Sequence, residues 1–195
     1  MEISELYQIY QAHPVITTDS RDCPEGSIFL ALKGASFDGN KFADMALEKG
    51  CAYVIIDEKE YAKEGDERYI LVEDCLTTFK ELAREHRRHF DIPVIGITGT
   101  NGKTTTKELV STVLDEKYNV MFTQGNFNND VGVPKTLFRL TPENEIAVVE
   151  MGASHPGDIK KLVDYVEPTC GMITNVGRAH LQGFGSFEGV KKTKG

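Results

Sequence analysis

The sequence predicts an α/β fold with parallel sheets, in which a small N-terminal α/β domain precedes a P-loop-type domain. Three observations predict it. Apolar, β-rich runs alternate with helical patterns along the 195 residues, and the glycine-rich stretch TGTNGKTTTK follows one of these runs at residues 98–107. Polar residues gather where the apolar runs end. Such alternation produces parallel sheets whose ligand sites lie at the carboxyl ends of the strands.

In the first domain, residues 3–11 and 43–49 show the spacing of short helices, and residues 27–32, 52–57 and 69–72 that of strands. Gly50 stands where a helix C-cap is expected. Residues 17–26 are interpreted as a polar turn and 33–42 as a loop. A long helix over residues 77–90 carries HRRH on what we interpret as a solvated face. The predicted domains are therefore 1–88 and 89–195.

The second domain begins with the strand after Pro93, and its alternation is regular. Helices are expected over 103–116, 133–140 and 156–166, strands over 118–123, 145–152 and 169–177, and another helix from Phe187. An open sheet continues until both faces are covered. We therefore expect a truncated chain that holds only the N-terminal part of its second domain.

The composition restricts the class of protein. A hydrophobic fraction of 40% can form a core, yet no run is long enough to span a bilayer, and the N-terminus MEISELYQIYQAHP shows no export signal. The four cysteines include no C-x-x-C pair, and a net charge of −8 argues against nucleic acid as the main partner. We expect a cytoplasmic, monomeric protein without membrane insertion.

The glycine-rich stretch predicts a binding loop for a nucleoside triphosphate. A strand, a tight glycine turn and a helix N-terminus bring backbone N–H groups and the positive end of a helix dipole to one spot. The usual pattern G-x-x-x-x-G-K-[ST] would place glycine where this chain has Ile97, so the motif is a variant. The predicted ATP-binding residues are Gly99, Thr100, Asn101, Gly102, Lys103, Thr104 and Thr105.

Three further groups of polar residues lie near predicted strand ends. Glu150 closes the run IAVVE and, with the Thr104 hydroxyl, is a candidate Mg²⁺ ligand. His180 and His155 stay undecided on chemistry alone, because imidazole is not a ligand that Mg²⁺ favours. The segment with Asn126, Asn128 and Asn129 suits either a structured loop or a polar substrate.

In the first domain, two polar turns flank the strand at 27–32. Arg21 and Lys33 carry charges that could clamp a diphosphate, and the chemistry alone leaves this question open. The candidate substrate-binding residues of these turns are Ser20, Arg21, Lys33, Asp38, Gly39 and Asn40.

Taken together, these motifs resemble the Mur ligases of peptidoglycan synthesis. TGTNGKTTTK resembles the ATP loop of that family, and TTDSR with FLALKGASFDGNKF resembles its uridine-nucleotide domain. GNFNNDVGVP, EMGASHPGDI and TNVGRAHLQGFGS follow in the order of the family, so the resemblance covers essentially the whole chain. The last three motifs are most similar to the branch that adds D-Ala-D-Ala.

The resemblance implies an ATP-dependent ligase reaction. ATP would phosphorylate the terminal carboxylate of UDP-MurNAc-tripeptide, and the amine of D-Ala-D-Ala would attack the acyl phosphate. Residues 1–88 would bind the uridine nucleotide, and Lys103, Glu150, His180 and Lys194 would be catalytic. The resemblance further implies that Thr104 and Glu150 hold one Mg²⁺, that His180 holds a second, and that Lys194 is carbamylated.

Because the domain that closes over the phosphates would be missing, we expect the 195-residue chain alone to be inactive. Two alternatives stay open at this point. One is another Mur-type or folylpolyglutamate-type ligase, against which the DSR and FDGN turns argue. The other is a binding module for UDP-sugars and nucleotides that has no turnover.

Overall fold

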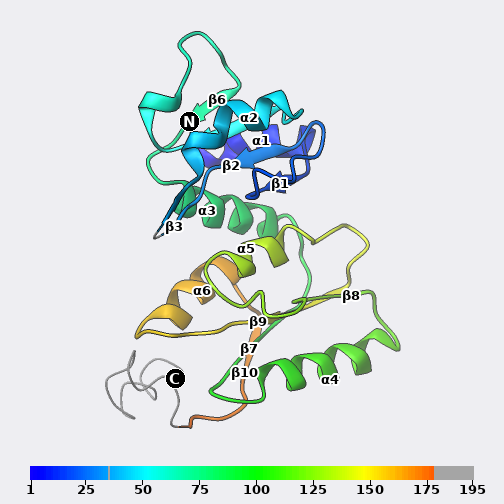
Figure 1. The fold of residues 1–195 in the computed structure, drawn as a ribbon. Helices are drawn as coiled ribbons and strands as arrows, with labels where there is room; N and C mark the ends of the chain where they lie inside the picture. The colour runs from blue at the N-terminus through cyan, green and yellow to red at the C-terminus, as the bar shows by residue number, and fades with distance from the viewer. Residues whose placement is uncertain (35, 178–195) are drawn as a thin grey trace. The chain divides into compact units, whose positions relative to one another are not determined.

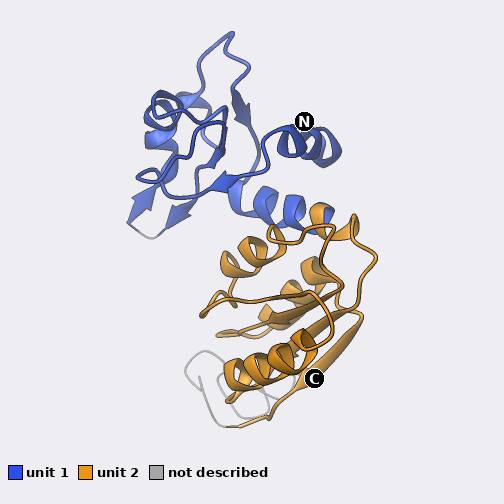
Figure 2. Cartoon of the chain, turned by 90° about the vertical axis from the view of Figure 1, so that its right-hand side faces the viewer, with its two compact units in different colours: residues 1–85 blue, residues 86–195 orange. Residues whose placement is uncertain are grey.

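The computed structural model describes residues 1–34 and 36–177, and these form an α/β protein with parallel sheets, as predicted. The chain divides into two compact units, Met1–Glu85 and His86–Gly195 (Figure 2). The division falls within the long helix α3 (Cys75–Arg88), which the sequence placed at the end of the first domain. Each unit contains its own four-stranded parallel sheet.

Unit 1 is built on a sheet of order β1-β2-β5-β6. Its strands are β1 (Ile16–Thr17), β2 (Ile28–Leu30), β5 (Tyr53–Ile56) and β6 (Tyr69–Leu71), and its first helices are α1 (Ile3–Ala12) and α2 (Ala43–Glu48). All three residues of β2 are fully buried, as expected for a parallel strand that is covered on both faces. Gly50, at φ 110°, ends α2 by donating its N–H to the Leu47 carbonyl, so the predicted C-cap is confirmed.

The short elements of unit 1 differ from the prediction. Residues 33–42, expected to be a loop, contain the antiparallel pair β3 (Lys33–Gly34) and β4 (Phe37–Asp38) and the 3₁₀ helix η1 (Gly39–Phe42). Strand β1 and the 3₁₀ helix η2 (Lys59–Tyr61) were not predicted either. A two-residue strand has no sequence period, and β1 exists because Ile16 pairs with Ile28 of β2.

Unit 2 has a sheet of order β10-β7-β9-β8, and all of its pairs are parallel. Its strands are β7 (Val94–Thr98), β8 (Val120–Phe122), β9 (Ile146–Glu150) and β10 (Cys170–Ile173), and its helices are α4 (Lys103–Asp115), α5 (Gly132–Leu137) and α6 (Asp158–Val166). Helix α4 lies on one side of the sheet, and α5 and α6 lie on the other (Figure 1). The helix expected from Phe187 lies outside the described residues.

The interpretation of HRRH as a solvated face is wrong for two of its residues. His86 and Arg87 are buried, with 7% and 8% of their surface exposed. His86 Nε2 contacts the Leu140 carbonyl at 3.0 Å, and burial lowers the pKa of this imidazole. Arg87 donates to the Phe90 carbonyl at 2.7 Å and to the Val166 carbonyl at 3.3 Å. The arginine is retained inside because it satisfies carbonyls at the end of α6.

Asn40 connects the loop segments of unit 1. Its Nδ2 donates to Asp38 and Asp57, both at 2.9 Å, and its Oδ1 accepts from the N–H groups of Asp57 and Glu58. The side chain is fully buried, and these four bonds use the whole capacity of one amide. Asn40 therefore fixes the turn at η1 to the end of β5.

We predict that Asn40→Ala lowers the free energy of unfolding by about 2–3 kcal/mol, because it leaves buried groups of Asp57 without partners. The measurement is urea denaturation followed by circular dichroism. Gln8→Ala, an exposed amide on α1, is the control and should change stability by less than about 0.5 kcal/mol. Equal midpoints for Asn40→Ala and the wild type would contradict the role of this residue.

Candidate functional site

The glycine-rich stretch forms the predicted loop between β7 and α4. Gly99 and Gly102 have φ values of 147° and 78°, and Gly102 is the N-cap of α4. A Cβ on Gly99 would lie 1.9 Å from Thr174 Oγ1, so a side chain is excluded there. Ile97 is fully buried within β7, which explains the variant motif: the close approach occurs at Gly99 instead.

The N-terminus of α4 faces the space in front of this loop. The Thr106 N–H donates to the Gly102 carbonyl at 2.9 Å, so the N–H groups of Lys103, Thr104 and Thr105 precede the helical ladder. Lys103 Nζ donates to the carbonyls of Gly99 at 3.0 Å and Thr100 at 3.3 Å. A phosphate oxygen is a stronger acceptor than a carbonyl, so the lysine can exchange partners when an anion binds.

The segment after β10 holds the other side of the loop. The Asn175 side chain accepts from the Asn101 N–H at 3.1 Å and donates to the Asn101 carbonyl at 3.0 Å. Its backbone carbonyl accepts from the Thr100 N–H at 3.0 Å, and Thr174 Oγ1 donates to the Asn101 carbonyl at 2.6 Å. The loop is therefore shaped from outside, and the N–H groups of Thr100 and Asn101 already have protein partners.

Glu150 lies at the end of β9, beside Ile97 of β7 in the sheet register. Its Oε1 accepts from Thr104 Oγ1 at 3.2 Å and from Asn128 Nδ2 at 2.8 Å. The side chain is fully buried, and Oε2 has no hydrogen-bond partner among the described residues. A buried carboxylate oxygen without a donor, next to a threonine hydroxyl, fits a hard divalent cation.

A cavity of about 580 Å³ lies between Lys103, the asparagine segment and the residues that follow β9. It brings together Lys103 and the three predicted asparagines, and it adds residues that the sequence left undecided or missed. The side chains include those of Lys103, Asn126, Asn128, Asn129, Asp130, Ser154, His155 and Asp158. Asn129 uses its Oδ1 to accept the N–H groups of Val131 and Gly132 at the start of α5. Part of the asparagine cluster is thus structural.

Sequence reasoning missed two supporting residues, Lys107 and Thr123. Lys107 is fully buried, and its Nζ donates to the Thr123 carbonyl at 2.7 Å. Thr123 Oγ1 accepts from the Glu150 N–H at 2.9 Å. These contacts connect α4 with the end of β8 and the end of β9. A lysine in an amphipathic helix is ordinarily exposed, so the sequence pattern offered no indication of this burial.

The predicted cations of unit 1 are paired with carboxylates. Arg21 makes a two-pronged contact with Asp19, at 2.9 and 2.7 Å. Lys33 Nζ lies 2.9 Å from Asp57 and 3.0 Å from Glu58, and hydrogen bonds to these two groups raise its pKa. Asn40 has no hydrogen-bonding capacity left for a ligand, which makes its side chain a structural group and not a substrate contact.

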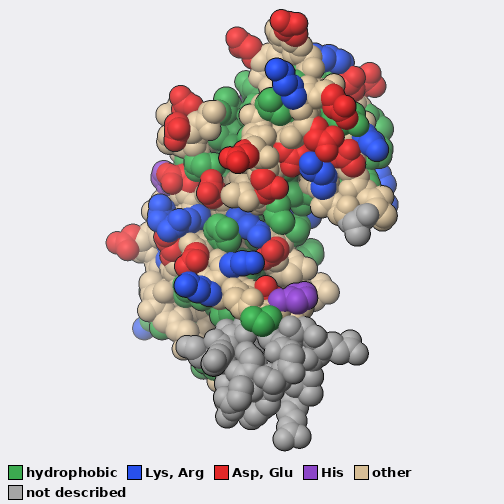
Figure 3. Space-filling model, turned by 90° about the vertical axis from the view of Figure 1, so that its left-hand side faces the viewer, with side chains coloured by type: hydrophobic (Ala, Val, Ile, Leu, Met, Phe, Trp, Pro, Cys, Tyr) green, Lys and Arg blue, Asp and Glu red, His purple; other side chains and the backbone are tan. Residues whose placement is uncertain are grey.

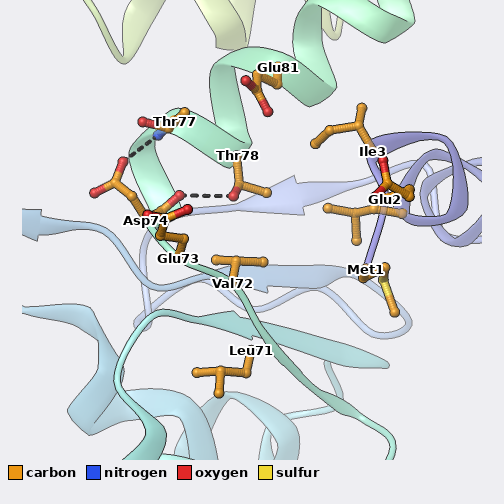
Figure 4. A pocket seen from close by; sticks show the side chains of 11 residues that line it. Met1, Glu2, Ile3, Leu71, Val72, Glu73, Asp74, Thr77, Thr78 and Glu81 are labelled. Carbon is orange, nitrogen blue, oxygen red and sulfur yellow. Dashed lines mark hydrogen bonds between the residues drawn. The ribbon is translucent and has the colours of Figure 1, made fainter.

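Unit 1 also contains a cavity of about 600 Å³ between α1, β6 and α3. Its lining includes Glu2, Glu73, Asp74 and Glu81, and Asp74 caps α3 through the Thr77 N–H at 2.7 Å (Figure 4). The predicted turns at Ser20–Arg21 and Lys33–Asn40 do not line it. A wall of carboxylates repels a diphosphate, so this cavity is not the predicted nucleotide site.

Two predicted site residues, His180 and Lys194, lie outside the described residues. Among the residues that the structure describes, no helix is long and apolar enough to cross a membrane. Figure 3 shows acidic and basic side chains interspersed on the face it presents.

A parallel sheet whose central strands end in a glycine loop and a buried carboxylate is typical of nucleotide-binding α/β proteins. Two family models match this chain: "Mur ligase family, catalytic domain" over residues 14–87 and "Mur ligase middle domain" over residues 97–195. The chain belongs to the Mur ligase family. The resemblance inferred from the motifs is thereby confirmed.

Two similar relatives carry the same name. UDP-N-acetylmuramoyl-tripeptide--D-alanyl-D-alanine ligase from Synechocystis is 44% identical over 179 residues, and that from Escherichia coli is 41% identical over 180 residues. Each alignment covers 92% of this chain and 39% of the relative. The chain therefore spans about two fifths of the length of these relatives.

Solved structures agree with these matches. MurF from Acinetobacter baumannii superposes with a TM-score of 0.89 at 34% identity, covering 98% of this chain and 44% of that one. MurF from Thermotoga maritima, solved in complex with ADP, gives a TM-score of 0.86 at 39% identity, covering 94% and 42%.

The Asn175 side chain bonds the N–H and the carbonyl of Asn101 in the glycine loop. We predict that Asn175→Ala raises the hydrogen-exchange rate of the Asn101 amide about 10-fold. The reason is that this N–H loses a hydrogen bond with a net value of about 1–1.5 kcal/mol. Exchange followed by mass spectrometry or NMR on the unliganded chain measures it. Asn119→Ala is the control, because its amide contacts Asn144 in an exposed turn. Unchanged protection at residue 101 would show that the Asn175 side chain does not hold the loop.

Proposed function

We propose that this chain belongs to an ATP-dependent ligase of peptidoglycan synthesis that joins D-Ala-D-Ala to UDP-MurNAc-tripeptide. The names of the relatives and of the superposed MurF structures support this substrate assignment. The observation that carries the ligase assignment is the Glu150 carboxylate, whose Oε1 accepts from Thr104 at the start of the loop helix and whose buried Oε2 has no hydrogen-bond partner among the described residues. The proposed reaction takes place in the cytoplasm, catalysed by a monomer.

In this proposal, the loop holds ATP through the N–H groups at the start of α4. Thr100 and Asn101 have backbone N–H groups that are bonded to Asn175, so the phosphates are bound by Gly102, Lys103, Thr104 and Thr105. Lys103 leaves the loop carbonyls and stabilises the charge of the transferred phosphoryl group. Gly99 serves by letting the loop pass close to Thr174.

Mg²⁺ is the proposed cation, and Thr104 and Glu150 are the described residues that would hold it. A magnesium ion bound there neutralises phosphate charge. The Thr104 hydroxyl donates a hydrogen bond to Glu150 Oε1, so the lone pairs of its oxygen remain available to the cation. His180 as ligand of a second ion and Lys194 as a carbamylated lysine remain proposals that follow from the family resemblance.

For unit 1, we propose binding of the uridine diphosphate end of the substrate at the turns with Ser20, Arg21, Lys33, Asp38 and Gly39. Arg21 and Lys33 supply the charge for the diphosphate. Both are already paired with carboxylates, so a diphosphate must replace or join Asp19, Asp57 and Glu58.

The experiment for the proposed function is a ligation assay on the full-length protein. We expect ATP, UDP-MurNAc-tripeptide and D-Ala-D-Ala to yield one amide product, ADP and phosphate, with the amide product detected by mass spectrometry. Product formation with glutamate as acceptor would favour a folylpolyglutamate-type ligase, and binding without turnover a non-catalytic module. Either outcome would refute the proposal.

We further predict that Lys103→Ala abolishes this activity and the thermal stabilisation by ATP. The unliganded chain should keep its unfolding midpoint within a few degrees, because Lys103 contacts only loop carbonyls among the described groups. Thermal unfolding with and without ATP measures both effects. An unchanged stabilisation by ATP in the variant would contradict the assignment of the loop.

For unit 1 we predict that Arg21→Ala weakens UDP-MurNAc binding about 10-fold or more, since a charge-assisted contact to phosphate is worth about 1.5–3 kcal/mol. Arg68→Ala is a closely matched control. Arg68 makes the same two-pronged contact with Asp66, two residues before it, as Arg21 makes with Asp19. Calorimetric titration measures both variants. Equal affinities for the two variants would place the diphosphate elsewhere.

A further inference from the structure

Asn128 occupies a particular place beside Glu150. Its Nδ2 donates to Glu150 Oε1 at 2.8 Å, and its backbone carbonyl accepts from the Gly152 N–H at 2.7 Å. A Cβ on Gly152 would lie 2.9 Å from Asn128 Cγ. Asn128 therefore contacts both Glu150 and Gly152 at the end of β9. A residue with a side chain at position 152 would collide with it.

The two oxygens of Glu150 differ because of this contact. Oε1 accepts two hydrogen bonds, from Asn128 and Thr104, while the buried Oε2 accepts none from the described residues. The Glu150 N–H donates to Thr123 Oγ1 at 2.9 Å, which fixes the backbone from which this side chain extends. A fully buried carboxylate that has no hydrogen-bond donor on one oxygen among the described residues lowers the stability of the fold. Its orientation must therefore be held by its neighbours.

We propose that Asn128 is a positioning residue that holds the Glu150 carboxylate in the orientation that leaves one oxygen free for the cation. By occupying Oε1, its amide leaves Oε2 as the free ligand and keeps the carboxylate in one orientation. This inference rests on the proposed cation at Glu150. It gives Asn128 a role different from direct binding of a polar substrate, which the sequence left open, beside a structured loop, for the three asparagines of this segment.

Partners in the outer shell of a metal site set the affinity for the metal through the ligands that they orient. Loss of the Asn128 amide should therefore act on the cation and not on the nucleotide alone. The remaining contacts of the loop, including the Lys107 bond to Thr123, keep the end of β8 in place when this side chain is shortened.

The test is calorimetric titration of ADP into the full-length protein, with Mg²⁺ or with EDTA. We expect Asn128→Ala to reduce the Mg²⁺-dependent gain in ADP affinity about 10- to 100-fold, a usual cost of losing an outer-shell partner. The affinity in EDTA and the unfolding midpoint should stay near those of the wild type. Asn144→Ala, an amide in the exposed turn before β9, is the control and should keep the full gain.

A second variant disturbs the contact between Asn128 and Glu150 without removing the Asn128 amide. Gly152→Ala keeps the amide but pushes Asn128 away from β9, so it should lose the Mg²⁺-dependent gain as well. A full gain in both variants would overturn the positioning role while the proposed function stands. Equal losses of ADP affinity with Mg²⁺ and with EDTA would also overturn it, because Asn128 would then affect nucleotide binding itself or the stability of the fold. If the wild type shows no Mg²⁺-dependent gain, the proposed cation site and this role are both refuted.

Discussion

The incomplete solvation of the Glu150 carboxylate is the constraint on which the site depends. The parallel pairing of β9 with β7 places this residue at the end of a strand whose last four residues are buried, and its own side chain is fully buried. Thr104 and Asn128 supply hydrogen bonds to one oxygen only. A carboxylate in this state is costly to the fold unless something with positive charge completes its surroundings. The same pairing sets the glycine loop beside it, so the fold brings the proposed anion site and the proposed cation site together.

The sequence was sufficient to predict a site residue wherever its residue type and its place at the end of a strand or loop could both be recognised within a short stretch. Lys103 and Thr104 follow a glycine turn at fixed spacing, and Glu150 ends an apolar run, so both places could be predicted without coordinates. The long strands and helices could be predicted for the same reason, because their periods extend over several residues. Strand β1 and the pair β3–β4 could not, since two residues carry no period and their existence depends on partners elsewhere in the chain.

The contacts that shape the site could not be predicted, because most of them join residues that are far apart in the sequence. Asn175 holds Asn101 across 74 residues, and Lys107 reaches the carbonyl of Thr123 from inside a helix. Nothing in the local sequence of Lys107 distinguishes it from an exposed lysine, and nothing in that of Asn40 predicts that its amide is consumed by Asp38, Asp57 and Glu58. Sequence patterns identify residues that touch ligands better than residues that hold those residues in place.

The charges of the chain explain how an acidic protein can accept anionic ligands. With a net charge of −8, long-range attraction of a nucleotide is absent, and binding must rely on groups at contact distance. Arg21 and Lys33 are each paired with a carboxylate, whereas Lys103 is held by neutral carbonyls. In the proposed assignment, a phosphate at Lys103 replaces neutral carbonyls as the partners of this lysine among the described residues, but a diphosphate in unit 1 must compete with fixed negative charges. The loop after β7 is therefore the stronger of the two proposed anion sites, and the turns of unit 1 hold a diphosphate firmly only when the rest of the ligand adds contacts of its own.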